Sequence, residues 1–228
     1  MSGSATGTAA QRPATAARRV FLALPLPPAA RAELARLTES ALAAHAPHLR
    51  LVDPSGYHVT VHFFGPLPGD ELRRAQALCG PVVEALAAPV RCRLAGLVQL
   101  PPRGPARVVC AVFGEGHDAL AAFLAAAGER IGGAAFPVAA RSPLPHVTVA
   151  RVRHGRRWRM SESAALPGAG PDTAAGTARR GIDFQRLPGH GEGAPAPFSL
   201  DQLVLFESRL HPSGARYVPL ASRHPAAR

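Results

Sequence analysis

Lysine is absent from this chain of 228 residues, and every formally charged basic side chain is an arginine. Such a bias is typical of a GC-rich coding sequence, so the number of arginines alone does not define a function. The formal net charge is nevertheless +11. A strongly basic surface attracts phosphate-bearing ligands and speeds their encounter with the protein. A polyanionic partner and a merely solvated arginine-rich face both fit this charge.

Cysteines and long apolar runs are also scarce. Cys79, Cys92 and Cys110 are odd in number, widely spaced and without a C-x-x-C pair, which excludes a disulfide framework and fits a reducing cytoplasm. The apolar run 20–24 follows two arginines in the manner of an export signal, but Pro25 ends it at about half the usual length. No later segment is apolar over the length that a bilayer requires. We therefore expect a cytoplasmic, soluble protein without a membrane partner.

The common nucleotide-cofactor motifs G-x-G-x-x-G and G-x-x-x-x-G-K-[ST] do not occur. Periodicity instead predicts strands and helices that alternate irregularly, with Asp70 as the cap of the second helix. The expected strands cover 19–25, 57–64, 90–100, 107–113, 145–152, 198–210 and 216–220, and the expected helices cover 28–44, 70–87 and 117–131. This pattern favours an α+β fold with antiparallel sheets over a doubly wound parallel sheet.

Low-complexity segments flank the predicted domain at both ends, and another interrupts it. Residues 1–17 are rich in Ala, Ser, Thr and Gly without periodicity, which predicts a disordered tail, and residues 221–228 form a second tail. Residues 18–220 are expected to form a single domain. Within it, residues 155–197 are rich in Gly, Pro, Ala and Arg and have no period, so we expect a flexible insertion that is either a lid or inert.

The tetrapeptide His-Val-Thr-Val occurs twice, at 58–61 and at 146–149, each time within an expected strand. Chance predicts roughly 0.35 H-x-T patterns in a chain of this composition. In a strand, residues i and i+2 project from the same face, so His58 points with Thr60 and His146 points with Thr148. The intervening valines face the other side, where they can be buried.

Two such strands side by side would gather two imidazoles and two hydroxyls around one cleft. Opposed imidazoles suit phosphodiester cleavage without a metal, because one can take a proton from the attacking water while the other gives a proton to the leaving oxygen. Threonine hydroxyls and an arginine can hold the non-bridging phosphate oxygens. A structural role would explain either histidine taken singly, but the matched pair favours catalysis.

The residues around both motifs resemble a known family. Segments 57–65 and 145–151 resemble the two signatures of the 2H phosphoesterases, and most closely those of the bacterial RNA 2′,3′-cyclic phosphodiesterases, also called 2′-5′ RNA ligase-like proteins. With the opening strand and the closing hairpin, the resemblance covers about residues 18–153 and 198–220. It implies a bilobal α+β fold, in which two similar lobes of antiparallel sheet carry helices outside and an active-site groove between them.

The resemblance also implies roles for individual residues. His58 would donate a proton to the leaving 3′ oxygen, and His146 would accept the proton of the attacking water, which gives a 2′-phosphate end. Thr60 and Thr148 would bind the phosphate, assisted by Arg151. No metal and no cofactor are implied. The partner of this monomeric enzyme would be RNA with a 2′,3′-cyclic phosphate end, such as a tRNA fragment.

Two positions depart from the family pattern. His62 stands where relatives often carry Lys or Arg, and strict alternation puts it on the face of His58 and Thr60. It is therefore a substrate contact, a group that perturbs the pKa of His58, or an exposed strand histidine. Cys110 stands where relatives often carry a large apolar residue.

Several alternatives stay open. The enzyme could act on another cyclic phosphate, such as a nucleotide or an ADP-ribose derivative, or it could join RNA ends in the reverse 2′-5′ ligation. It could also be a basic RNA-binding module without turnover, although a pure binder needs no matched acid and base. Phe63, Phe64 and Tyr217 are candidates for stacking on RNA bases, but aromatic residues on strands more often belong to the core.

Overall fold

The structure, a computed structural model, describes residues 17–86, 88–138, 144–160, 164–165, 171–172, 177–178, 180–187, 194–211 and 214–226. Strands and helices are interleaved along the chain. The amino-terminal part contains β1 (Arg18–Pro25), α1 (Pro28–Leu42), β2 (Leu49–Leu51), β3 (His58–Leu67), α2 (Gly69–Ala77) and α3 (Cys79–Val83), with short 3₁₀ turns at Ala43–His45 and Pro54–Gly56.

The remainder begins with β4 (Val90–Cys92), β5 (Leu94–Leu100), β6 (Val108–Phe113), α4 (His117–Gly133) and β7 (His146–Val152). It continues with β8 (Ala164–Ala165), β9 (Pro171–Asp172), β10 (Thr177–Ala178), β11 (Arg180–Asp183) and a 3₁₀ turn at Phe184–Arg186. It ends with β12 (Phe198–Leu200), β13 (Leu203–His211) and β14 (Gly214–Arg223).

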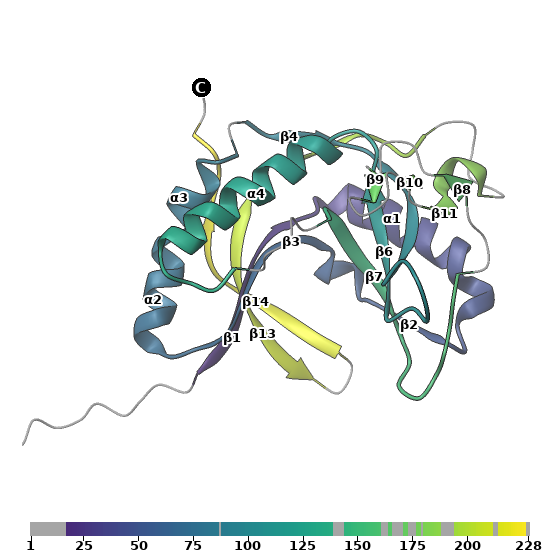
Figure 1. Cartoon of the computed structure of the whole chain (residues 1–228), viewed down its shortest axis with the longest axis horizontal. Coiled ribbons are helices and arrows are strands. Elements are labelled where there is room, and N and C mark those ends of the chain that lie inside the picture. Colours follow the sequence, from purple (N-terminus) through teal and green to yellow (C-terminus); the bar gives the residue numbers. More distant parts are fainter. Residues whose placement is uncertain are drawn as a thin grey trace, which may run out of the picture.

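One antiparallel sheet connects both halves of the molecule. Its strand order is β14-β13-β1-β3-β7-β6-β5-β11-β8, and β2 pairs with β7 beside this path. The two halves meet where β3 and β7 pair, at a single position with Val59 opposite Val147. Figure 1 shows β1, β13 and β14 on one side of this junction and β6 with β7 on the other. The predicted α+β fold with two lobes of antiparallel sheet is confirmed.

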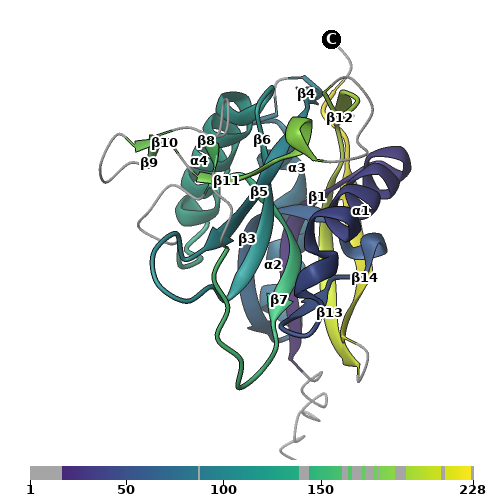
Figure 2. The same ribbon diagram turned by 90° about the vertical axis from the view of Figure 1, so that its right-hand side faces the viewer.

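Helices cover the outside of the sheet. Helix α4 follows a strand of the second half, yet it contacts α3 and β3 of the first half, and Figure 1 shows α2, α3 and α4 together on that side. Helix α1 buries one apolar stripe that includes Leu34, Leu37 and Leu42, as its helical spacing predicts. Figure 2 shows the molecule from the side on which α1 lies in front of the sheet.

Three expected elements are interrupted. The helix expected over 70–87 is broken into α2 and α3, with Pro81, which has no amide hydrogen, inside the short second piece. The cap prediction is wrong: the flanking residue is Pro68, and Asp70 lies in the first turn of α2. The strand expected over 90–100 divides into β4 and β5, and the one over 198–210 divides into β12 and β13. In both cases the first piece leaves the main sheet, because β4 and β12 pair with each other.

The segment 155–197 contains more structure than its composition predicts. Strand β11 pairs with β5 and so adds to the main sheet, while Ile182 and Phe184 are buried in the core. Trp158 is buried as well. The expectation of an irregular insertion is therefore wrong for these residues, whereas other parts of the segment lie outside the described residues. The predicted amino-terminal tail also lies outside them, apart from Ala17, and β14 extends to Arg223, beyond the predicted boundary.

The structure also shows the state of the cysteines and the character of the helices. Cys79, Cys92 and Cys110 are all free and buried. Within the described ranges, no helix combines the length and the apolar character that crossing a membrane would need.

Candidate active site

The two His-Val-Thr-Val motifs lie on the two strands that join the halves of the sheet. Val59 of β3 is directly opposite Val147 of β7, and both side chains are buried. The strands are antiparallel, so one residue either way along this register brings His58 opposite Thr148 and Thr60 opposite His146. These four side chains share the face away from the buried valines. Each imidazole therefore has a threonine hydroxyl across the strand pair, in an arrangement with local two-fold pseudosymmetry.

A β-bulge lies at the last residue of each motif and changes which of the following residues face the site. On β3 the register with β1 skips Val61: Ala23 pairs with Thr60, and Leu22 pairs with His62. Phe63 then pairs with Phe21, so Phe63 continues the face of His58 and Thr60.

The bulge on β7 falls at the matching position of the second motif. The register with β6 skips Val149, because Cys110 pairs with Thr148 and Val109 pairs with Ala150. Arg151 therefore continues the face of His146 and Thr148, although strict alternation would turn it away. The bulges thus bring a phenylalanine and an arginine to the site, each five residues after its motif histidine.

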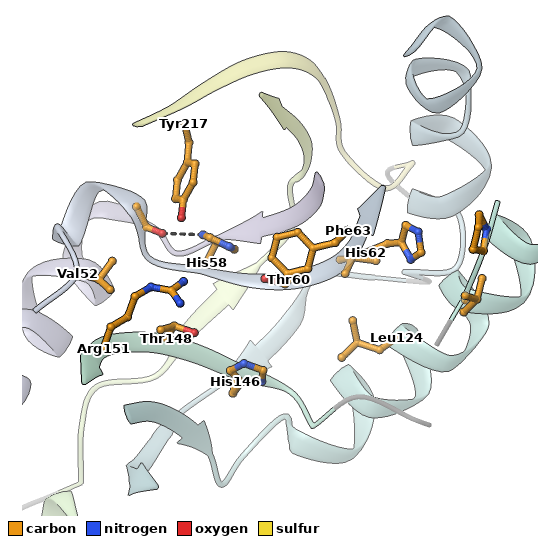
Figure 3. A pocket seen from close by; sticks show the side chains of 15 residues that line it. Val52, His58, Thr60, His62, Phe63, Leu124, His146, Thr148, Arg151 and Tyr217 are labelled. Carbon is orange, nitrogen blue, oxygen red and sulfur yellow. Dashed lines mark hydrogen bonds between the residues drawn. The ribbon is translucent and has the colours of Figure 1, made fainter. Parts of the chain in front are cut away.

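These side chains line one groove between the two halves, with a volume of about 570 Å³. We call it the central groove. Figure 3 shows His58, Thr60 and Phe63 along one strand and His146, Thr148 and Arg151 along the other. The rest of the lining includes Val52, Gly56, Val61, His62, Leu124, Gly128, Pro137, Val138 and Tyr217. All five residues to which the sequence assigns a part in catalysis or phosphate binding, and His62 in addition, line the same groove.

Both imidazoles are held in the same way. His58 Nδ1 lies 2.6 Å from the carbonyl oxygen of Gly56, and His146 Nδ1 lies 2.7 Å from that of Leu144. A carbonyl oxygen only accepts hydrogen bonds, so Nδ1 carries the hydrogen in each ring. In a neutral ring, Nε2 is then the atom with the lone pair, and in a charged ring it is the atom that can donate. The bond to Gly56 is dashed in Figure 3.

The surroundings of His58 favour its neutral form. Burial lowers the pKa of His58 to about 4; the hydrogen bond to the Gly56 carbonyl opposes this change, while the charges of His146 and Arg151 add to it. The ring packs against Phe21, with centroids 5.0 Å apart, and against the edge of Tyr217, at 5.3 Å. These aromatic contacts exclude water from one side of the imidazole and fix its plane.

Thr148 has a buried neighbour on its own strand face. The Sγ atom of Cys110 lies 3.9 Å from Oγ1 of Thr148, and burial raises the pKa of this thiol to about 12. The thiol therefore stays protonated, as a weak donor or acceptor to the hydroxyl. Cys110 belongs to a small buried apolar cluster with Val112 of the same strand and with Val98, its partner on β5.

His62 does not share the face of the two motif residues on its strand. Its register partner is Leu22, on the face of Val59, because the bulge at Val61 interrupts the alternation on which the expectation rests. His62 packs edge-on against Phe64, with ring centroids 4.6 Å apart, and burial lowers its pKa. It lines the end of the central groove where β3 has diverged from β7.

The sequence leaves open whether Tyr217 and Phe63 belong to the core or to the site. Tyr217 lies on β14, far along the chain from either motif, and only the tertiary structure brings its ring onto His58. Phe63 is 68% exposed and lines the groove, whereas Phe64 packs against Phe136. Across the described ranges, no three or more His, Cys, Asp or Glu side chains gather in a way that could hold a metal ion.

Known proteins resemble the chain in structure rather than in sequence. No protein-family model and no curated protein sequence matches it. TT0787 of Thermus thermophilus is 26% identical, with 90% of this chain and 97% of that protein covered and a TM-score of 0.61. The matching structure of a phosphoesterase is 18% identical, with coverage of 92% and 99% and a TM-score of 0.59.

The third comparison is with LigT of E. coli. Its apo form is 17% identical, with coverage of 93% and 100% and a TM-score of 0.64. LigT complexed with 3′-AMP also matches, at 16% identity and a TM-score of 0.59. These matches extend over nearly the whole of both chains, so the likeness includes both halves of the sheet. The chain therefore shares its fold with E. coli LigT and with the phosphoesterase of the second comparison.

Proposed function

We propose that this protein is a 2H phosphoesterase that hydrolyses RNA 2′,3′-cyclic phosphate ends to 2′-phosphomonoesters by metal-free acid–base catalysis. The observation that carries the proposal is the pairing across β3 and β7, in which each imidazole is fixed through Nδ1 to a backbone carbonyl and stands across from a threonine hydroxyl. Two imidazoles that each present Nε2 to one groove can act on opposite sides of a phosphorus atom.

In the proposed reaction, His146 Nε2 accepts a proton from a water molecule whose oxygen attacks the phosphorus. The bond between phosphorus and the 3′ oxygen breaks, and His58 Nε2 donates a proton to that oxygen. The products are a 3′-hydroxyl and a 2′-phosphomonoester. Thr60, Thr148 and Arg151 hold the non-bridging oxygens and stabilise the negative charge of the transition state.

The protonation state of His58 couples this reaction to substrate binding. With a pKa of about 4, the ring is neutral near pH 7 before substrate arrives, so it must gain a proton before it can donate one. A cyclic phosphate carries a negative charge, which favours the charged imidazole when the two are close. The Gly56 carbonyl acts in the same direction, because it accepts a hydrogen bond from the ring. We therefore expect substrate to raise the pKa of His58.

The complex of E. coli LigT with 3′-AMP adds support, because that ligand is a nucleoside phosphate bound by a protein of the same fold. Carrying nucleotide binding over to this chain is part of the proposal. We further expect a monomer that acts in the cytoplasm on RNA ends such as those of tRNA fragments, without a metal or a cofactor.

The test is hydrolysis of a short RNA that ends in a 2′,3′-cyclic phosphate, with EDTA present. We expect the wild type to form a 2′-phosphate end, and His58→Ala and His146→Ala each to lose about 100-fold or more in rate. Addition of an RNA with a 5′-hydroxyl asks whether a 2′-5′ linkage forms instead, which would assign ligation. Absence of turnover, or turnover indifferent to both substitutions, would leave a basic RNA-binding protein as the better account.

A further inference from the structure

A second hollow adjoins the central groove on the side of Arg151. It has a volume of about 760 Å³, and it shares with the central groove the residues Val52, Gly56, Phe63, Arg151 and Tyr217. The two spaces therefore border on the same side chains, and a ligand long enough to pass these shared residues can occupy both.

Arginines from four different strands line this second space, which we call the arginine hollow. Arg19 comes from β1, Arg50 from β2, Arg151 from β7 and Arg216 from β14. Among the described residues, none of the four has an ion-pair partner, whereas Arg91 and other arginines elsewhere on the surface do.

Acidic side chains do little to balance these charges. Asp53 is the one acidic residue among the described residues that line the hollow, and its carboxylate accepts a hydrogen bond from the backbone amide of Ser55 at 2.8 Å. The lining thus combines four guanidinium groups with one carboxylate, and His211 lies at its edge.

The strand register makes this concentration of charge costly. Arg50 on β2 is directly opposite Arg151 on β7, so two like charges occupy one cross-strand position. Such pairs destabilise a sheet in the absence of an anion. An anion between them would turn the repulsion into two charge-assisted hydrogen bonds, for which the planar fork of arginine is well suited.

The two ends of the central groove differ in charge. This difference determines through which end a polyanion bound in the groove extends. The end away from the arginine hollow is lined by the apolar residues Leu124, Pro137 and Val138, and by His62, whose pKa is lowered by burial so that its neutral form is favoured. Phe63, which lies beside His62 on β3, presents an exposed ring that lines both the groove and the hollow. Exposed aromatic rings beside a basic channel are the usual platform for unpaired bases of single-stranded nucleic acid.

From these observations we infer that the arginine hollow binds the sugar–phosphate backbone of the nucleotides that precede the cyclic end, so the substrate class is an oligoribonucleotide chain rather than a cyclic mononucleotide. The inference rests on the proposed function. In this arrangement the cyclic phosphate lies between His58 and His146, and the chain runs past Phe63 and Arg151. Arg19, Arg50 and Arg216 then contact phosphates that a mononucleotide does not possess.

The experiment compares kcat/KM for two substrates that share the same terminal nucleoside: a cyclic mononucleotide and a pentamer ending in the same 2′,3′-cyclic phosphate. The variants are Arg50→Gln and Arg216→Gln, on separate strands, so that a folding defect in one leaves the other informative. Arg73→Gln is the matched control, because Arg73 is exposed on α2, pairs with Asp70 and lines neither space.

We expect the wild type to prefer the pentamer about tenfold or more at low salt, and this preference to shrink as salt rises. Arg50→Gln and Arg216→Gln should each reduce the ratio of the two kcat/KM values about tenfold, while Arg73→Gln should leave it within about twofold. A wild-type ratio near one, or a ratio that neither variant changes, would overturn the inference, while hydrolysis of the pentamer would still uphold the proposed function. Failure of the wild type to hydrolyse either substrate would overturn both.

Discussion

The depressed pKa of His58 makes a specific prediction about stability. In the unfolded chain a histidine titrates near its ordinary pKa of 6.5, whereas in the folded protein burial lowers the value to about 4. Between these two values the unfolded chain binds a proton that the folded protein does not. Unfolding is therefore favoured progressively as the pH falls from 6.5 to 4, and the corresponding stability is fully present only above this window.

The magnitude follows from the two pKa values. At pH 7 both states are largely neutral at this position, so the contribution is small. At pH 5 the folded protein still excludes the proton while nearly all unfolded chains carry it, which costs about 2 kcal/mol of stability relative to pH 7. His62 titrates in the same direction, because burial also lowers its pKa, but it is present in every variant compared.

The assay is urea unfolding at pH 7 and pH 5 for the wild type and for His58→Gln, which has no titratable group at this position. The wild type should lose about 2 kcal/mol more than the variant between the two pH values. Other groups that titrate in this range cancel in the comparison. If both proteins lose the same amount to within about 0.5 kcal/mol, then His58 is not held neutral by its surroundings, and the account of its protonation in the groove is wrong.

Substitutions at three further positions test other parts of the account. Thr148→Val keeps the side-chain shape but removes the hydroxyl opposite His58, and it should lower kcat/KM for the cyclic phosphate by about 10- to 100-fold. Tyr217→Phe should retain most of the activity because a ring edge still packs against His58, whereas Tyr217→Ala should lower kcat about tenfold with a smaller change in KM; steady-state kinetics separates the two. Trp158→Ala should lower the free energy of unfolding by about 3 kcal/mol in urea, because the indole is buried although it lies in the segment predicted to be irregular.

The sequence was sufficient to predict the main features of the site. The repeated motif identified both strands, and alternation correctly put Val59 and Val147 on the buried face. It also indicated that the two motif strands, if they lay side by side, would gather both polar pairs around one cleft, and β3 and β7 do pair. The short-range pattern contains this information, since the period of a strand is a local property.

Alternation did not predict the β-bulges in the two strands. A bulge lies at the last residue of each motif, Val61 and Val149, and each shifts the alternation by one residue. Residue types do not reveal such a bulge, so strict alternation would assign His62 to the site face and turn Arg151 away. The resemblance to a family identified Arg151, and the structure supplies the physical reason.

The pairing of strands that are far apart in the chain was also not predictable from the sequence. Strand β2 is only three residues long and pairs with β7 far along the chain, so nothing in its own residues predicts it. Strand β11 lies in a segment of low complexity, yet its pairing with β5 and the burial of Phe184 give it a place in the sheet. Both elements depend on tertiary partners rather than on intrinsic propensity.

The most direct test of the central claim compares single and double substitutions of the two histidines. We would measure kcat/KM on RNA with a 2′,3′-cyclic phosphate end, in the presence of EDTA, for the wild type, His58→Ala, His146→Ala and the double variant. An acid and a base that act as one unit predict a loss of about 100-fold or more in each single variant, and a double variant hardly slower than the slower single one. A single variant that keeps nearly full activity, or single losses that multiply in the double variant, would contradict the account.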